Sequence, residues 1–466
     1  MTRSLRHLFN INFCSPTMNA LDLPALAPDL EWITDSTRVH KFSQDFNWYS
    51  PVLKRQLEGL SAQVVARPKT QEEIAQVVSL CASHQVPLTL RGTGTGNYGQ
   101  CVPLKGGVVL DLSAYNQFLG IRDGVATAQS GIRLIELDKA AKPLGYELRW
   151  IPSTFRSATL GGLYGGGFGG AGSITYGPIA APGNIVSVKV MSMGVEPQIH
   201  TYRGQEALIY HHTYGTNGIV LELEVAMAPS IAWSEFLITF EDFEQALSFS
   251  SDLSVGSGYV KKEVALIASP IVGYFTALSE YLPSHRHAVV ACIAPQSVTA
   301  LKELALVHHG VVSYEKNAQE VHASQRTLIE YTWNHTTLHA LKVDKTLTYI
   351  QTGFNPQRYK EQVLALQSLL NPEVMMHLEF IRTKEGLINC SGLQIVRYTS
   401  DERLQEIMQI HRDHGVQINN PHVYTVEDGK AGGQLNPEIL RAKDRHDPQG
   451  LLNPGKLRTW SAPSVA

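Results

Sequence analysis

The sequence has no run of about 18 uninterrupted apolar residues, so no segment is long and apolar enough to span a bilayer as a helix. It also lacks an excess of one charge, because 39 basic and 42 acidic residues leave a net charge of −3. Surfaces that bind nucleic acid or anionic membranes are normally rich in Lys and Arg, so neither partner is expected. Charged residues make up 17% and hydrophobic residues 43%, a composition that allows two domains with substantial cores.

Cysteine is scarce and scattered, which excludes a disulfide framework and a zinc ribbon. The five cysteines never form a C-x-x-C pair; they are Cys14, Cys81, Cys101, Cys292 and Cys390. This cysteine pattern favours a reducing compartment, and we expect a cytoplasmic protein. Residues 1–17 are basic with no acid before Asp22, as in an organellar presequence, although Met18 could equally be the natural start.

The most informative stretch is a glycine loop, which we define as residues 91–100, Arg-Gly-Thr-Gly-Thr-Gly-Asn-Tyr-Gly-Gln. Apolar, strand-like runs at residues 86–90 and 107–112 enclose it. Alternating glycines allow positive φ and expose consecutive N–H groups, a pattern that binds phosphate. A Rossmann motif is excluded because no helix fits between Gly99 and the next strand. A P-loop match at residues 450–456 is accidental, because Leu457 replaces the magnesium-binding Ser or Thr.

The segment around this loop alternates strand and helix signals. Strands are predicted at residues 63–68, 86–90, 108–112 and 125–128, and helices from Thr70 and over residues 132–144. A second glycine-rich stretch follows, in which eight of the twelve residues from Gly161 to Gly172 are glycine. Leu163, Tyr164 and Phe168 lie among these glycines, which argues against a flexible linker and for close approach of backbones or a flat ligand.

Four motifs in this order resemble one family. They are R-G-x-G-T-G at Arg91, P-S and A-T-L-G-G from Pro152, G-S-x-x-Y-G at Gly172, and D-P-x-G-L-L-N-P-G-K at Asp447. The pattern resembles the FAD-linked oxidases of the vanillyl-alcohol oxidase and p-cresol methylhydroxylase superfamily, in particular the glycolate-oxidase-subunit and 2-hydroxyacid dehydrogenase branch. The resemblance implies an α+β fold, with a two-subdomain FAD-binding domain of the p-cresol methylhydroxylase type and an α+β cap (substrate) domain.

The resemblance also implies a domain order and cofactor contacts. The order is an N-terminal extension (1–46), the FAD-binding domain (47–230), the cap (231–415) and a segment returning to the FAD domain (416–466). The implied FAD contacts are Arg91, Gly92, Thr93, Gly94, Thr95, Gly96, Asn97, Pro152, Ser153, Ala158, Thr159, Gly161, Gly162, Ser173, Tyr176, Gly177, Asn184 and Ile185. For Arg91, a structural ion pair is an equal alternative. FAD is expected to be non-covalent, because the loop holds no His or Cys up to Tyr98.

Candidate catalytic residues are sought in the cap and near the C-terminus. His335 is the leading general base, ahead of His422 and Tyr424. Arg382 and Arg397 are candidates for a carboxylate clamp, and either could equally be an ordinary surface charge. His335 and His339 are spaced as in zinc proteases but lack the catalytic Glu, so no metal site is predicted. The remaining histidine pairs, among them His211-His212, are expected at the surface or at helix ends.

The predicted function is an FAD-dependent oxidoreductase that oxidises a small organic substrate at a C–OH or similar centre by hydride transfer to flavin N5. Oxygen, a quinone or a redox protein would accept the electrons. The H-x-G-D-G-N-x-H segment usual in D-lactate and glycolate dehydrogenases is missing, which argues against metal-assisted oxidation of a D-2-hydroxyacid. Two alternatives stay open: a flavin-binding electron-transfer subunit without its own substrate site, and a flavin-free binder of nucleotide phosphates.

Overall fold

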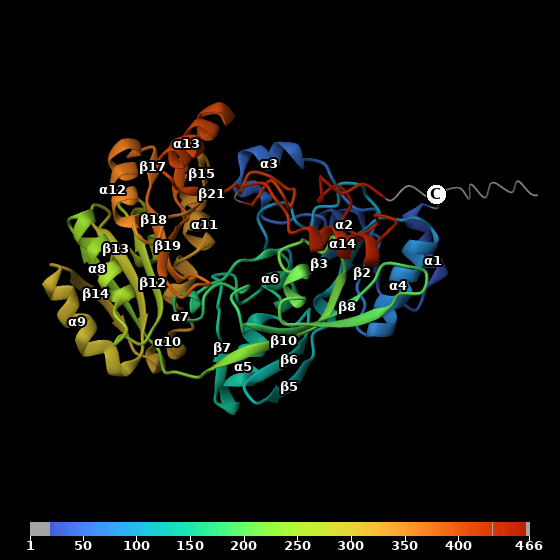
Figure 1. Ribbon diagram of the computed structural model, residues 1–466, viewed down its shortest axis with the longest axis horizontal. Coiled ribbons are helices and arrows are strands. Elements are labelled where there is room, and N and C mark those ends of the chain that lie inside the picture. The colour runs from blue at the N-terminus through green and yellow to red at the C-terminus, as the bar shows by residue number, and fades with distance from the viewer. Residues whose placement is uncertain (1–18, 431, 463–466) are drawn as a thin grey trace, which may run out of the picture.

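The structure is a computed structural model that describes residues 19–430 and 432–462. The presequence-like stretch and the alternative start at Met18 lie outside these residues. Figure 1 shows two halves side by side, one built from the N-terminal part of the chain with the red C-terminal segment, the other from the yellow and orange part. Among the described residues, none of the helices combines the length and apolarity that a membrane crossing needs.

The first sheet has the order β1-β2-β4-β3, in which β4 is parallel to both β2 and β3. Its strands are β1 (Trp32–Ile33), β2 (Val64–Ala66), β3 (Leu88–Arg91) and β4 (Val108–Asp111), accompanied by α1 (Leu23–Leu26), α2 (Ser36–Phe42), α3 (Pro51–Gln56) and α4 (Gln71–Ser83). Thr70 caps α4 as predicted, and the apolar residues of that helix, among them Ile74, Val77 and Val78, are buried. The glycine loop starts at the end of β3 and leads to β4.

The second sheet is antiparallel with the order β5-β6-β10-β8-β9, and β7 also pairs with β10. Its strands are β5 (Phe118–Arg122), β6 (Val125–Gln129), β7 (Tyr146–Leu148), β8 (Ile185–Met191), β9 (Ile199–Arg203) and β10 (Ile219–Pro229). The helices of this region are α5 (Leu134–Ala141), α6 (Leu160–Gly166) and α7 (Ser173–Tyr176). The glycine-rich stretch is therefore folded structure and not a linker, as predicted.

The cap is organised on a long antiparallel sheet with the order β14-β11-β13-β12-β18-β19-β16-β21. Its strands are β11 (Ser234–Phe240), β12 (Lys261–Ile267), β13 (His287–Ile293), β14 (Val311–Lys316), β16 (Gln351–Gly353), β18 (His377–Arg382), β19 (Ile388–Gly392) and β21 (Gln417–Asn419). A small sheet β15-β20-β17 consists of β15 (Leu347–Tyr349), β17 (Val374–Met375) and β20 (Ile395–Arg397).

Helices cover the long sheet through separate apolar cores. The larger core joins it to α8 (Phe243–Val255), α9 (Val298–Val307), α12 (Tyr359–Leu370) and α13 (Asp401–Asp413). A second core includes Ala340 and Leu341 of α11 (Asn334–Val343). The remaining helices are α10 (Ala318–Ser324) and α14 (Pro437–His446). The predicted α+β class, with an FAD-type half and a further antiparallel-sheet half, is confirmed.

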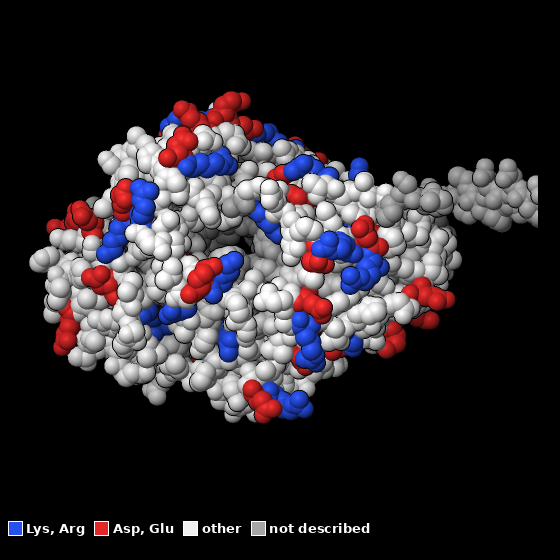
Figure 2. All heavy atoms as spheres, in the orientation of Figure 1, with Lys and Arg blue, Asp and Glu red and all other residues white. Residues whose placement is uncertain are grey.

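The C-terminal segment lies against the first sheet. Leu452 forms a parallel bridge to Leu88 of β3, and the N–H of Asn453 donates to the carbonyl of Leu88 at 2.8 Å. On the face shown in Figure 2, basic and acidic side chains are interspersed, in keeping with the balanced charge of the sequence. The same view shows a hollow between the two halves.

Candidate functional site

A cavity of about 590 Å³ lies where the glycine loop, α6 and the cap meet. We call it the glycine-loop cavity. Its volume lies within the roughly 300–1,000 Å³ typical of cofactor and ligand sites. The site residues predicted from the sequence that line it are Arg91, Gly92, Thr93, Gly94, Thr95, Gly96, Asn97, Pro152, Ser153, Ala158, Thr159, Gly161, Gly162 and His335.

The glycine loop is tightly folded at Gly94. This residue has φ of +70°, and a Cβ there would lie 2.1 Å from Nη2 of Arg91. Arg91 donates from Nη1 to the carbonyl of Gln44 at 2.6 Å and from Nη2 to the carbonyl of Thr93 at 3.2 Å. In the described part of the chain Arg91 has no salt bridge, so the ion-pair alternative is not observed. Its guanidinium instead holds the backbone of the loop.

Two side chains of the C-terminal segment brace the same loop. The fully buried Lys456 donates from Nζ to the carbonyl of Gly99 at 2.5 Å, and burial lowers its pKa to about 8. Asn453 donates from Nδ2 to the carbonyls of Gln100 and Tyr214, both at 2.8 Å. The loop is therefore held by residues more than 350 positions later in the sequence.

Glycine in α6 permits close packing beside the cavity. Thr159 caps the helix by accepting the N–H of Gly162 at 3.1 Å. A Cβ on Gly161 would lie 2.6 Å from Cβ of Ser130, so no larger residue fits there without movement. Phe168 is 47% exposed and lines the cavity. The cavity therefore has a backbone-rich wall with an accessible aromatic ring.

The cap contributes the opposite wall through Trp333, Asn334 and His335, at the start of α11. Trp333 has φ of +52°, a conformation that bulky residues rarely adopt. Its N–H donates to Oε1 of the fully buried Glu379 at 2.6 Å. A strained residue persists only where its surroundings hold it, and here a buried carboxylate does so.

Glu379 belongs to a buried polar cluster. Nε2 of His377 lies 2.7 Å from Oε1 of Glu379, and Trp333 Nε1 donates to Oε2 of Glu263 at 3.4 Å. Burial raises the pKa of Glu379 to about 7 and raises the pKa of Glu263 strongly. Burial also lowers the pKa of His377 to about 3, so its imidazole is neutral. The cluster lies behind the residues that face the cavity.

Direct hydrogen bonds join the loop to the cap. Asn97 donates from Nδ2 to the hydroxyl of Tyr349 at 2.5 Å, and the hydroxyl of Tyr98 donates to Oε1 of Gln351 at 2.8 Å. Tyr349 is fully buried, and Gln351 lines the cavity. The two walls are therefore joined directly by side-chain hydrogen bonds.

His335 is the candidate base that reaches this cavity. Burial lowers its pKa, so its imidazole is neutral at pH 7 and able to accept a proton. The other imidazole of this helix, His339, does not line the cavity: it stacks on Tyr331 at 4.5 Å between ring centroids.

The structure places the other candidate catalytic residues elsewhere. His422 lies with Nδ1 2.8 Å from the hydroxyl of Ser50 and Nε2 2.9 Å from the carbonyl of Tyr349, so both ring nitrogens are engaged. The ring of Tyr424 packs under Nζ of Lys456 at 5.1 Å. Arg382 lines a different cavity. None of these three residues lines the glycine-loop cavity.

Five residues predicted as FAD contacts also do not line the glycine-loop cavity; they are Ser173, Tyr176, Gly177, Asn184 and Ile185. Ser173 accepts the N–H of Gly170 at 3.1 Å. Asn184 donates from Nδ2 to the carbonyls of Tyr176 and Pro178, both at 2.9 Å. In this structure they shape the chain that follows α6, and their contact with FAD stays a prediction.

Two residues that the sequence analysis expected at the surface or at helix ends, His211 and His212, line the cavity. Burial lowers the pKa of His211 to about 3 and that of His212 to about 4. The backbone here returns to α6, since the N–H of Tyr214 donates to the carbonyl of Gly165 at 2.9 Å. His212 and Tyr214 both have positive φ, a local strain that periodicity does not reveal.

Unpartnered polar atoms gather in this cavity. Within the described residues, no hydrogen-bond partner is found for buried atoms of lining residues at Arg91 Nε, Gln100 Oε1, Ser130 Oγ, His211 Nε2, His212 Nδ1 and Asn334 Oδ1. Buried polar atoms normally have partners, so this set suits a large polar ligand. The loop N–H groups suit phosphates, and the apolar Leu112 and Val220 suit a flat ring. The cavity fits FAD.

Comparison with known proteins agrees with this fit. Residues 62–194 match the family model described as an FAD binding domain. An uncharacterised FAD-linked oxidoreductase of Mycobacterium tuberculosis is 28% identical over 194 residues, which are 39% of this chain and 41% of that protein. Glycolate oxidase subunit GlcD of Bacillus subtilis is 26% identical over 213 residues, 44% of this chain and 45% of its own length.

D-lactate dehydrogenase of Anaerostipes hadrus is 28% identical over 195 residues, 40% of this chain and 41% of that protein. This chain therefore matches about two fifths of the length of these curated relatives. A solved structure of alkyldihydroxyacetonephosphate synthase shares the fold with a TM-score of 0.66 and 14% identity, covering 93% of this chain and 85% of that one. The chain thus carries an FAD-binding domain of the p-cresol methylhydroxylase type and is a distant relative of the FAD-linked oxidoreductases.

Proposed function

We propose that this protein is an FAD-dependent oxidoreductase that oxidises a small organic substrate at a C–OH or similar centre. The observation that carries the proposal is that His335, a neutral imidazole, lines the same cavity as the glycine loop. FAD and substrate would meet there between the FAD-binding part (residues 47–230 with 416–466) and the cap (231–415), to whose sheet β21 of the returning segment adds an edge strand. Oxygen, a quinone or a redox protein would take up the electrons.

Each wall of the cavity has a task in this proposal. The N–H groups of the loop would hold the cofactor by its phosphates, and the side-chain-free backbone at Gly161 and Gly162 would let the cofactor lie close to α6. Bound FAD would supply the two-electron acceptor. His335 would take the hydroxyl proton of the substrate, and the neighbouring Asn334, whose Oδ1 has no partner among the described residues, would help to orient the substrate.

We infer that FAD is held without a covalent bond. Cys101 lines the cavity, but burial raises the pKa of its thiol to about 11, so little thiolate is present at neutral pH. Arg91 Nη1 also lies 3.1 Å from the sulfur. Acid precipitation of the yellow protein is expected to release intact FAD into the supernatant, whereas flavin in the pellet would contradict the inference.

Anaerobic mixing of the holoprotein with a panel of hydroxyacids, alditols and aromatic alcohols tests the oxidoreductase proposal. Bleaching of the flavin absorbance by one of them is the expected result. If the whole panel leaves the flavin oxidised while dithionite still reduces it, the substrate chemistry is absent, and a flavin-binding electron-transfer subunit becomes the better description.

A further inference from the structure

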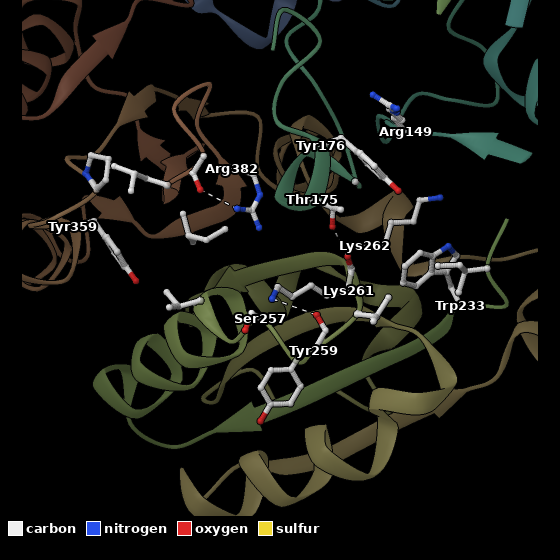
Figure 3. Close-up of a pocket in the computed structure, with 18 of the residues that line it drawn as sticks. Arg149, Thr175, Tyr176, Trp233, Ser257, Tyr259, Lys261, Lys262, Tyr359 and Arg382 are labelled. Atoms are coloured by element: carbon white, nitrogen blue, oxygen red, sulfur yellow. Dashed lines mark hydrogen bonds between the residues drawn. The ribbon is translucent and has the colours of Figure 1, made fainter. Parts of the chain in front are cut away.

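A second cavity, of about 630 Å³, lies between the two halves (Figure 3). We call it the interdomain cavity. On one side it is lined by Arg149 and α7, and on the other by the start of β12, the end of β18 and the start of α12. It shares no lining residue with the glycine-loop cavity. The exposed side chains of Val255 and Leu387 lie at its edge, so it is open to solvent.

The charge of this cavity is one-sided. Among the described residues that line it are four cations, Arg149, Lys261, Lys262 and Arg382, and a single carboxylate, that of Glu147. The carboxylate is already committed, because Lys262 Nζ lies 2.7 Å from Oε1 of Glu147 and both side chains are buried. The lining therefore carries three positive charges that no lining carboxylate neutralises.

Those three cations contact neutral groups in the described part of the chain. Lys261 is 6% exposed, and its Nζ donates to the carbonyl of Gly256 at 2.7 Å. Arg382 donates from Nη1 to the carbonyl of Gly386 at 2.9 Å. Arg149 donates to the carbonyl of Gly183 and to Oδ1 of Asn184, and its guanidinium lies over the ring of Tyr176. Carbonyl contacts leave the net charge uncompensated.

The charges affect each other across the cavity. Burial, together with the positive charge of Arg382, lowers the pKa of Lys261 to about 8. Buried charges are normally paired, and an unpaired cation beside another is unfavourable. Figure 3 shows Lys261 and Arg382 on opposite sides of the open space, with Tyr359 on the left and Tyr176 and Trp233 on the right. An anion between Lys261 and Arg382 would neutralise both.

We propose that the interdomain cavity is a second ligand site, which binds a small organic anion with its phosphate or carboxylate group between Lys261 and Arg382. The volume exceeds that of an inorganic anion, so the ligand has an organic body, which the aromatic rings of Tyr359, Tyr259 and Trp233 would contact. Arginine binds both oxyanions through paired N–H groups, and lysine adds a point charge. The site is separate from the FAD and substrate site proposed above.

Isothermal titration of the FAD-saturated holoprotein tests the proposal, since a filled glycine loop cannot itself bind the probe. The probes are pyrophosphate, inorganic phosphate, citrate and succinate, each titrated up to about 10 mM. Saturable binding of at least one probe to one site is expected. A preference for pyrophosphate would identify a phosphorylated ligand, and a preference for citrate a polycarboxylate; binding of none would overturn the proposal.

The double variant Lys261→Met, Arg382→Met is expected to weaken binding by about 10-fold or more while retaining FAD. The matched control is Lys302→Met, Arg397→Met, which removes a Lys and an Arg of the cap outside both cavities and is expected to bind like the parent. Equal binding by parent and double variant would place the probe elsewhere and contradict the proposal.

A measurement on the unaltered protein covers the case in which the variant does not fold. Pyridoxal 5′-phosphate with cyanoborohydride is expected to label Lys261 ahead of the exposed lysines. The phosphate of this reagent suits the proposed anion site, and its aldehyde reacts with a neutral amine, which Lys261 supplies more readily because its pKa is lowered. The best probe should protect Lys261 at least about 10-fold, measured by mass spectrometry. Labelling of Lys261 no faster than that of exposed lysines, or without protection, would refute the site.

Discussion

At position 94 the loop accommodates only glycine. Gly94→Val is expected to abolish FAD retention, because valine resists φ of +70° and its Cβ would overlap the Arg91 guanidinium 2.1 Å away. Flavin absorbance per protein after gel filtration measures retention. Gly145→Val is the matched control, since Gly145 also has positive φ, at +84°, but has no atom within 4 Å of an added Cβ. Near-stoichiometric FAD in Gly94→Val would mean that the phosphates bind elsewhere.

His335 is the residue on which the proposed chemistry depends. His335→Ala is expected to keep FAD and to slow flavin reduction by the identified substrate about 100-fold or more, the usual loss on removing a general base. Stopped-flow absorbance measures the rate. His339→Gln, one turn further along α11 and outside the cavity, is expected to reduce at the parental rate. If His335→Ala matches the parent, the base is another residue.

The sequence predicted the loop residues of the site better than the residues that reach it from the segment after α6. Gly92, Gly94 and Gly96 are a local signal, since their spacing alone indicates exposed N–H groups; of the three, Gly94 has the positive φ that the pattern allows. His211 and His212 reach the cavity because their segment turns back onto α6. That turn depends on strained backbone at His212 and Tyr214 and on tertiary contacts. Neither of these leaves a periodic pattern of apolar residues in the sequence, so periodicity could not predict the turn.

At the scale of elements, α11 starts from a turn that a buried carboxylate holds. Glu379→Ala is expected to destabilise the protein by roughly 1–3 kcal/mol, because the part-buried N–H of Trp333 would lose its acceptor. Glu379→Gln keeps an oxygen in place and should retain the turn. Urea unfolding measures both, and equal stability of Glu379→Ala and the parent would show that the turn does not need this acceptor.

The same carboxyl group has a defined pH signature. Its pKa is raised by burial to about 7 in the folded protein, from an ordinary value of 4.5. Between these pH values the unfolded chain binds fewer protons, so this group's contribution to stability falls as pH rises, by up to about 1.4 kcal/mol per pH unit. The stability of Glu379→Gln relative to the parent should therefore increase from pH 5 to pH 7. A constant difference would contradict the raised pKa.

Elements in the FAD half were predictable because their signals are local. Thr70 marks the start of α4, and Leu134, Leu137 and Ala141 mark the buried face of α5. The cap was predictable only as α+β. Its sheet pairs β12 with β18 and β16 with β21, and such distant pairings follow from packing and not from any one segment.

At the scale of the whole molecule, buried neutral histidines link folding to pH. Burial lowers the pKa of His211 and His377 to about 3 and that of His212 and His422 to about 4. As pH falls below about 6.5 the unfolded chain takes up protons that the folded chain excludes, so stability falls on acidification. Each histidine contributes up to about 1.4 kcal/mol per pH unit.

His422→Asn tests this contribution at one site outside the cavity. Denaturant unfolding is expected to show that the free energy of unfolding falls less steeply between pH 7 and pH 5 in the variant than in the parent. The difference in slope is the contribution of one histidine. An identical pH slope would mean that His422 takes up its proton in the folded state.

The contacts of Asn453 and Lys456 with the glycine loop also have a temporal consequence for synthesis of the chain. During translation the loop leaves the ribosome hundreds of residues before the two side chains that brace it. A nascent chain can therefore form β3 and α4 early but cannot complete the loop's support until residue 456 has emerged. Stable capture of FAD is thus expected only after residues 453–456 have been synthesised and have reached the loop.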